Sequence, residues 1–339
     1  EVMLIDFTKH PILKAPTDEE IILLGEADPR LLSDLHEAHE GRIRAAESDP
    51  LRHGFDLPGW GRMRDAIDKY DEVITFGGNR SGKTTGCAKM VMQAVTENQD
   101  GHVVCFSQNA DTSVKVQQAA VWEMMPKEFR RKTKGIEGYI NFSMQNGFTG
   151  SSFIFPDTRT RVDFKTYTQF SNNQTILEGF EFGFKNSERL NIGAWLDEYL
   201  GDAALVNTLR FRLATRDSKM ILGFTPIDGY TPFVSEYLKG AETLETKNAE
   251  LLGKDVPVQQ YSPERDVGIV YLHSDENPFG GYDRIAKDLK NSSDDQIMVR
   301  AYGLPTKSMT SLLPNFTPEL NVVTDEPNKH GIKFPDKDS

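Results

Sequence analysis

The chain has 339 residues, with 51 acidic and 39 basic side chains and a formal net charge of −12. The length suggests about two domains, and the acidic excess argues against a uniformly basic nucleic-acid coat while leaving room for a local basic patch. No apolar run approaches the roughly 18 residues of a membrane span and the sequence shows no signal-peptide pattern, so no membrane partner is expected. Cys87 and Cys105 have no metal-ligand spacing and form no disulfide framework, which favours a reducing cytoplasm.

Residues 1–70 are expected to form a helical, charged N-terminal segment. A helix starting near residues 28–29 would place Leu31, Leu32 and Leu35 at helical spacing. Residues 57–61 predict a turn before a short helix at 62–69. Trp60 in this turn either packs on an adenine base or belongs to the core, and the core is favoured.

Residues 77–84 fit the pattern G-x-x-x-x-G-K-[ST] of a phosphate-binding loop. An apolar strand at residues 73–76 precedes the loop and a helix at 84–97 follows it, which is the context that the motif requires. The glycines allow backbone N–H groups to face phosphate oxygens, the lysine binds the β- and γ-phosphates, and the threonine hydroxyl binds Mg²⁺. The predicted nucleotide-binding residues are Gly77, Gly78, Asn79, Arg80, Ser81, Gly82, Lys83, Thr84 and Thr85.

Residues 71–255 alternate between short apolar runs and helical patterns. Strands are expected at 73–76, 103–106, 153–155, 162–164, 192–196 and 220–224, with a helix at 111–125. This alternation predicts an α/β fold with a mainly parallel sheet flanked by helices. Together with the loop, it defines a P-loop NTPase core of the ASCE type, to which the N-terminal helices and a small lid or linker region are added.

Two adjacent carboxylates, Asp197 and Glu198, follow the apolar run at 192–196. Ligands bind at the carboxyl ends of strands in open α/β sheets. Asp197 is the expected partner of Mg²⁺ beside Thr84, and Glu198 is the expected general base that activates the attacking water. The alternative is a solvated acidic turn after a core strand.

Two further residues are candidates for the catalytic step. Thr225 ends the next strand and would hydrogen-bond the γ-phosphate or the water, or else merely cap the strand. Arg80 lies inside the loop and would stabilise charge at the γ-phosphate, or else pair with an acidic neighbour. Basic residues also cluster at 127–134 and 210–219, either as solvated faces, as phosphate-backbone contacts, or as a trans-acting arginine, for which Arg212 is the first candidate.

Residues 256–316 are expected to form the lid or linker region, with a strand at 267–272 and helices at 282–289 and 294–302. Residues 317–339 are polar and look like a tail or the truncated start of a further domain. A helix is also expected at 231–241, just before this region.

The order of these motifs over roughly residues 55–316 resembles the ATPase domain of a tailed-bacteriophage terminase large subunit. The loop with its arginine, the Asp197–Glu198 pair, Thr225 and the stretch Asp275-Glu276-Asn277-Pro278 match the family pattern in sequence order. The resemblance implies a motor that hydrolyses ATP with Mg²⁺ and translocates double-stranded viral DNA into a procapsid. It implies as partners the portal protein of the procapsid and a small terminase subunit, and a location in the host cytoplasm, docked on the procapsid. The chain would act as a homo-oligomeric ring on the portal, with a monomer as the alternative in isolation.

The family usually continues into a nuclease domain, and no nuclease activity is expected from this chain. Two other functions remain open. A helicase-like, nucleic-acid-dependent ATPase would need a second core domain, which the sequence after about residue 255 does not suggest. An ATP-dependent switch or scaffold would not need a strong base beside Asp197.

Overall fold

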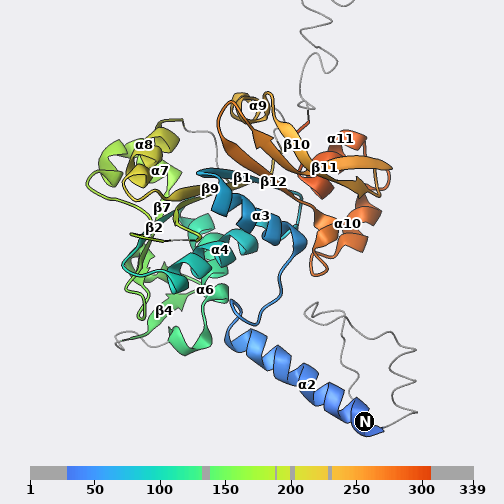
Figure 1. Cartoon of the computed structure of the whole chain (residues 1–339), viewed down its shortest axis with the longest axis horizontal. Helices are drawn as coiled ribbons and strands as arrows, with labels where there is room; N and C mark the ends of the chain where they lie inside the picture. The colour runs from blue at the N-terminus through green and yellow to red at the C-terminus, as the bar shows by residue number, and fades with distance from the viewer. Residues whose placement is uncertain (1–28, 132–137, 188, 199–202, 228–230, 307–339) are drawn as a thin grey trace, which may run out of the picture.

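The structure is a computed structural model that describes residues 29–131, 138–187, 189–198, 203–227 and 231–306. The polar tail predicted at 317–339 lies outside these residues. The described chain begins with α2 (Pro29–Ser48), a 20-residue helix that projects from the body of the molecule (Figure 1). An ion pair of 3.3 Å between Glu47 and Lys127 links the end of α2 to that body.

The second helix, α3 (Pro58–Lys69), begins four residues earlier than the predicted short helix. The prediction of a turn over residues 57–61 is therefore wrong. Proline is well suited to the first helical turn because its missing N–H has no helical partner there. Burial of Trp60, Met63 and Ile67 on one face then holds α3 against the sheet.

The centre of the fold is a nine-stranded sheet. Its six central strands, from β12 to β7, are parallel, whereas β10, β11 and β6 are antiparallel to their neighbours. In spatial order the strands are β10 (Glu242–Ala249), β11 (Lys254–Ser262), β12 (Val267–Leu272), β1 (Glu72–Gly77), β9 (Lys219–Phe224), β8 (Ile192–Asp197), β2 (His102–Ser107), β7 (Arg161–Thr166) and β6 (Ser152–Ile154). The mainly parallel sheet predicted from the alternating pattern is confirmed.

Helices cover both faces of the sheet, because successive strand residues point to opposite sides. On one face, Val73 of β1 and Trp195 of β8 pack with α3, α4 (Lys83–Glu97) and α6 (Ala119–Met124). On the other, Ile74 and Leu196 pack with α8 (Ala203–Ala214) and α9 (Pro232–Leu238). Figure 1 shows α3 and α4 lying across the sheet on the same side.

The helix expected at 111–125 is interrupted. It consists of α5 (Ala110–Thr112), a π-helical stretch (Ser113–Gln118) and α6. A small three-stranded sheet follows, formed by β3 (Arg130–Arg131), β4 (Ile140–Ser143) and β5 (Gly147–Phe148). The remaining short elements before β8 are the 3₁₀ turns Lys127–Phe129, Thr149–Ser151 and Gln174–Leu177 and the helix α7 (Tyr167–Asn172).

The predicted end of the ATPase core at residue 255 does not coincide with the end of the sheet. It falls within β11, and β12 then pairs in parallel with β1, the strand that leads into the phosphate loop. The sequence could not reveal this pairing because the two strands are separated by almost the whole core. After β12 come the 3₁₀ turn Ser274–Glu276 and the helices α10 (Tyr282–Leu289) and α11 (Asp294–Tyr302). In the described part of the chain, no helix has the length and apolar character needed to cross a membrane.

Candidate nucleotide-binding and hydrolysis site

The phosphate loop connects the end of β1 to the start of α4, as the motif requires. Lys83 is the first residue of α4, with its side chain only 6% exposed. Gly82, just before it, has φ +84°, a left-handed conformation that favours glycine. A Cβ on Gly77 would lie 2.7 Å from Ser81 Oγ, so a larger residue at this position would clash with the Ser81 side chain within the loop.

The predicted carboxylates lie beside this loop. β9 lies between β1 and β8, so the sheet brings the end of β8 close to the start of α4. Lys83 Nζ forms an ion pair with Glu198 Oε1. Thr84 Oγ1 lies 3.5 Å from Asp197 Oδ1, to which it donates a long hydrogen bond. Residues separated by more than 110 positions in the chain thus form one polar cluster.

Glu198 is held in an unusual backbone conformation with φ +47°. Its N–H donates to Gly223 O at 2.6 Å, and its Oε2 accepts a 3.2 Å hydrogen bond from the Thr225 N–H. The structure therefore places Thr225 next to Glu198 through its backbone. The predicted role of the Thr225 hydroxyl towards phosphate or water stays a prediction.

The oxygen atoms of the cluster fit a magnesium ion. Asp197 is almost fully buried, yet its Oδ2 has no hydrogen-bond partner among the described residues. Burial raises the pKa of Asp197 to about 6, with Lys83 acting against this shift and Glu198 adding to it. A divalent cation would compensate the buried charge, and Mg²⁺ prefers carboxylate, hydroxyl, phosphate and water oxygens. In the described chain no group of three or more His, Cys, Asp or Glu side chains is placed to hold a metal ion.

Arg80 is exposed and has φ +58°. Its Nη1 lies 3.8 Å from the position of a Cβ on Gly281, so the guanidinium is directed towards the loop before α10. Its carbonyl oxygen accepts a 2.7 Å hydrogen bond from Asn277 Nδ2. The predicted contact of Arg80 with the γ-phosphate stays a prediction.

Two aromatic residues support the site through contacts that the sequence did not predict. Trp60 is buried under the loop, and its Nε1–H donates to Gly82 O at 3.1 Å. A Cβ on Gly86 would lie 2.4 Å from the same nitrogen, so Trp60 occupies the space beside the first turn of α4. The core interpretation of Trp60 thus agrees with its burial. Tyr167 OH donates to the carbonyl of Asp197 at 2.8 Å, and no local pattern signalled this contact.

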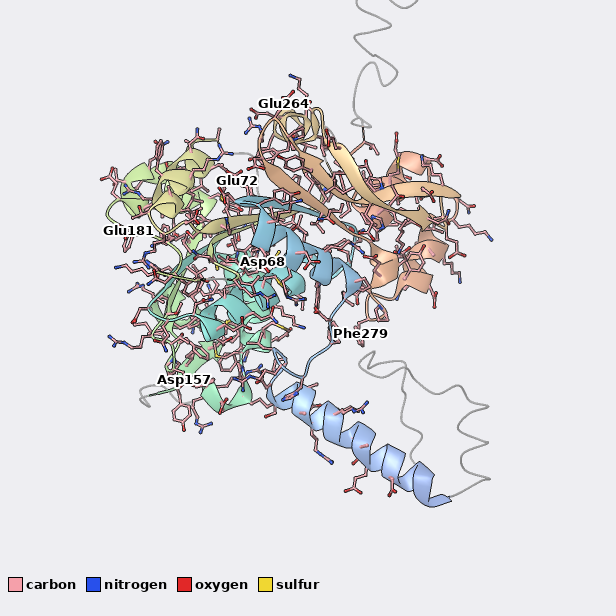
Figure 2. The ribbon with its side chains drawn as sticks, in the orientation of Figure 1. Asp68, Glu72, Asp157, Glu181, Glu264 and Phe279 are labelled. Carbon is pink, nitrogen blue, oxygen red and sulfur yellow. The ribbon has the colours of Figure 1, made fainter. Side chains whose placement is uncertain are left out.

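A third aromatic side chain lies at the surface near the loop. Phe279 is 40% exposed and packs against Phe55, with 4.6 Å between the ring centroids. Figure 2 shows Phe279 beside the chain segment that leads from α2 into α3. The pair joins the segment before α3 to the segment after β12.

Most of the basic residues near 210–219 form ion pairs or hydrogen bonds with other residues of the fold. Arg210 forms a bidentate ion pair with Glu72 at the start of β1; Figure 2 labels Glu72 in the upper part of the molecule. Arg216 donates to Gly183 O at 2.9 Å, and Lys219 pairs with Asp71 at 2.5 Å. These residues lie at the amino ends of β1 and β9, opposite the phosphate loop.

The described residues of the basic cluster at 127–134 also contact other residues of the protein. Arg130 donates to Met125 O at 2.6 Å and stacks over Trp122, and the Arg131 guanidinium lies 3.9 Å from the ring centre of Tyr139. The residues at 132–134 lie outside the described chain. The predicted roles of either cluster in DNA contact, and of Arg212 in trans, remain predictions.

The strand order and the loop define the fold of a P-loop NTPase of the ASCE type, in which an extra strand separates the loop strand from the acidic strand. A phage large terminase shares this fold. The large terminase of the thermophilic bacteriophage D6E superposes with a TM-score of 0.51 at 14% identity, over 73% of this chain and 53% of that one. This chain therefore spans about half the length of that terminase. The resemblance predicted from the motif order is confirmed at the level of the fold.

Other solved structures show weaker likeness. The D6E terminase in complex with ADP gives a TM-score of 0.47 at 16% identity, over 72% of this chain and 50% of that one. A mutant ATPase domain of the Thermus phage P74-26 large terminase gives 0.48 at 11% identity, over 74% of this chain and 95% of that domain. No protein-family model matches the sequence, and no curated protein matches it.

Proposed function

We propose that this chain is a Mg²⁺-dependent ATPase of the large-terminase type that drives double-stranded DNA into a procapsid. The observation that supports the proposal most directly is the cluster of Lys83, Thr84, Asp197 and Glu198 at the carboxyl ends of β1 and β8. Phosphoryl transfer requires a phosphate cradle, a metal-binding carboxylate and a residue that orients water, and this cluster provides candidates for each.

In the proposed reaction the N–H groups of the loop and Lys83 bind the triphosphate. Thr84 and Asp197 would hold Mg²⁺, which would neutralise charge on the phosphate oxygens. Glu198 accepts a proton as water attacks the γ-phosphorus, and ADP leaves with the bridging oxygen. Arg80 and Thr225 act at the γ-phosphate.

The contacts of Glu198 imply one rearrangement before hydrolysis. Glu198 shares its carboxylate between Lys83 and the Thr225 N–H. When the triphosphate binds, Lys83 turns towards phosphate oxygen, and the freed Glu198 oxygen becomes available to water. Hydrolysis by this route thus requires the release of Glu198 from its ion pair with Lys83.

The motor function, in contrast to ATP hydrolysis, is supported by the shared fold and the order of the motifs. The proposed partners are double-stranded DNA, a portal protein and a small terminase subunit, with a ring of this chain acting on a procapsid in the host cytoplasm. Because the chain is acidic overall, DNA would bind through a local patch.

Phosphate release in the presence of Mg²⁺ tests the proposal, with double-stranded DNA, single-stranded DNA or no DNA added. We expect Mg²⁺-dependent hydrolysis that double-stranded DNA stimulates most. Absence of hydrolysis under all conditions would refute the ATPase, and hydrolysis indifferent to DNA would contradict the motor. Stimulation by single strands together with strand separation would favour the helicase-like alternative.

A further inference from the structure

The outer part of the phosphate loop is held by side chains from the segment between β12 and α10. Ser274 Oγ donates to the carbonyl of Asn79 at 2.7 Å, and Asn277 Nδ2 donates to the carbonyl of Arg80 at 2.7 Å. Two successive carbonyl groups of the loop are therefore fixed from a segment almost 200 residues away in sequence. The phosphate-loop motif does not include either donor.

The backbone of this segment also fits closely against the loop. A Cβ on Gly280 would lie 2.6 Å from Arg80 O, and a Cβ on Gly78 would lie 2.5 Å from Ala301 O. Both contacts are with backbone atoms, so a side chain at position 280 would force this segment away from the loop, and one at position 78 would force the loop away from α11. Residues 78–80 of the loop are thus in direct contact both with the segment after β12 and with α11.

The two donors are anchored by ion pairs at the residues between them. Asp275 pairs with Lys247 of β10 at 2.7 Å, and Glu276 pairs with Arg62 of α3 at 2.5 Å. The carboxylates of Asp275 and Glu276 are only 14% and 10% exposed, so solvent screens these pairs less than it screens surface pairs. These ion pairs therefore tie the segment to β10 and to α3.

Fixing the two carbonyls also fixes the direction of two amides. The described chain contains no cis peptide bond, and in a trans peptide unit the C=O and the following N–H point in opposite directions. The Asn79 and Arg80 carbonyls point towards Ser274 and Asn277. The N–H groups of Arg80 and Ser81 must therefore point to the other side, and the Ser81 N–H donates a 3.3 Å hydrogen bond to Gly78 O within the loop.

We propose that Ser274 and Asn277 are positioning residues that orient the phosphate-binding amides of the loop for the polyphosphate chain of a nucleotide. They act through the loop backbone and do not touch the base or the sugar. This inference rests on the proposed function and deepens it, because it assigns to the segment after β12 a part in binding that the motif alone gives to residues 77–85.

The test compares variants that remove each donor. Asn277→Asp keeps the acceptor for the Phe279 N–H, which lies 3.1 Å from Oδ1, but replaces the donor by an oxygen that repels the Arg80 carbonyl. Ser274→Ala removes the other donor, and Ser274→Thr restores a hydroxyl. Asn248→Asp is the matched control, since it makes the same chemical change on exposed β10.

Isothermal titration calorimetry with ATP and with inorganic tripolyphosphate gives the readout. We expect Asn277→Asp and Ser274→Ala to weaken both ligands by the same factor, about tenfold, as for loss of one hydrogen bond. Ser274→Thr should restore affinity and Asn248→Asp should leave it unchanged. Circular dichroism melting of the ligand-free variants checks that they are folded at the temperature of titration, and the Ser274 pair alone decides the question where Asn277→Asp is unfolded.

The outcomes separate this inference from the proposed function. If wild-type protein binds ATP and the variants bind both ligands normally, the positioning role is refuted while the nucleotide site stands. If ATP is weakened and tripolyphosphate is not, these residues act at the base or sugar, and the inference is again refuted. If wild-type protein binds neither ligand, the proposed nucleotide site fails and the inference fails with it.

Discussion

The Glu198→Gln substitution gives the sharpest test of the hydrolysis site, because it should change turnover and binding in opposite directions. Glutamine preserves the size of the side chain and an oxygen that accepts from the Thr225 N–H, 3.2 Å away in the structure. It removes the negative charge that pairs with Lys83 and the basicity needed to accept a proton from water. The backbone of the turn after β8 should therefore keep its position, while residue 198 can no longer accept a proton from water.

Both magnitudes follow from the arrangement of the site. Loss of a positioned general base lowers turnover by about 10²- to 10⁴-fold. The pair between Lys83 and Glu198 is only partly shielded, with the two side chains 6% and 43% exposed, so solvent limits its stabilisation to about 1 kcal/mol. ATP no longer competes with a carboxylate for Lys83 in the variant, and its affinity should rise by up to about fivefold.

Turnover is measured as phosphate release at saturating ATP and Mg²⁺, and affinity by titration with a non-hydrolysable ATP analogue. Glu245→Gln is the matched control, since this glutamate is exposed on β10 and far along the sheet from the loop. Glu198→Gln protein that still hydrolyses ATP at the wild-type rate would remove Glu198 from the role of base. Weaker analogue binding would refute the competition for Lys83.

Three further results are expected. Lys83→Ala should weaken ATP binding about 10- to 100-fold in calorimetric titration, since a charged hydrogen bond to phosphate is lost, and unchanged affinity would contradict the phosphate loop. Gly86→Ala should lower stability by about 1–3 kcal/mol in urea unfolding, because its Cβ would lie 2.4 Å from Trp60 Nε1; an unaltered midpoint would disprove that close contact. Burial, with Lys247 next, lowers the pKa of His273 from 6.5 to about 3, so the unfolded chain binds more protons between these values and stability should fall as pH falls from about 6.5 towards 3. His273→Gln should flatten the pH dependence of the urea midpoint in this range, and an equally steep curve would exclude His273 as its source.

The parts of the site that lie within single short segments could be predicted from the sequence. The loop at residues 77–84 needs glycines, a lysine and a threonine at fixed spacing between a strand and a helix, so its fold is encoded locally. The same holds for Asp197 and Glu198 at the end of an apolar run. That both would meet at one edge followed from the rule that parallel strands present their carboxyl ends together.

The supports of the site could not be predicted, because each depends on a partner far away in the chain. Trp60 was placed in a turn because proline and glycine flank it, but burial against the sheet and the first-turn preference of proline favour a helix. Tyr167 reaches Asp197 from α7 with no sequence signal. Ser274 and Asn277 lie beyond the predicted end of the core at residue 255, and only the pairing of β12 with β1 brings them to the loop.

The register of the parallel strands explains why these residues meet. Leu272 pairs with Gly77, so the residues that follow β12 emerge beside the residues that follow β1, and Ser274 comes opposite Asn79. On the other side of β1, Phe224 pairs with Phe76, so Thr225 emerges at the level of the loop. Each of these side chains lies one or two residues beyond the last registered pair. A shift of β12 by one residue against β1 would exchange the faces of its side chains and would move the Ser274 hydroxyl away from the loop carbonyl, so the support of the phosphate loop depends on the packing of a strand that the motif does not contain.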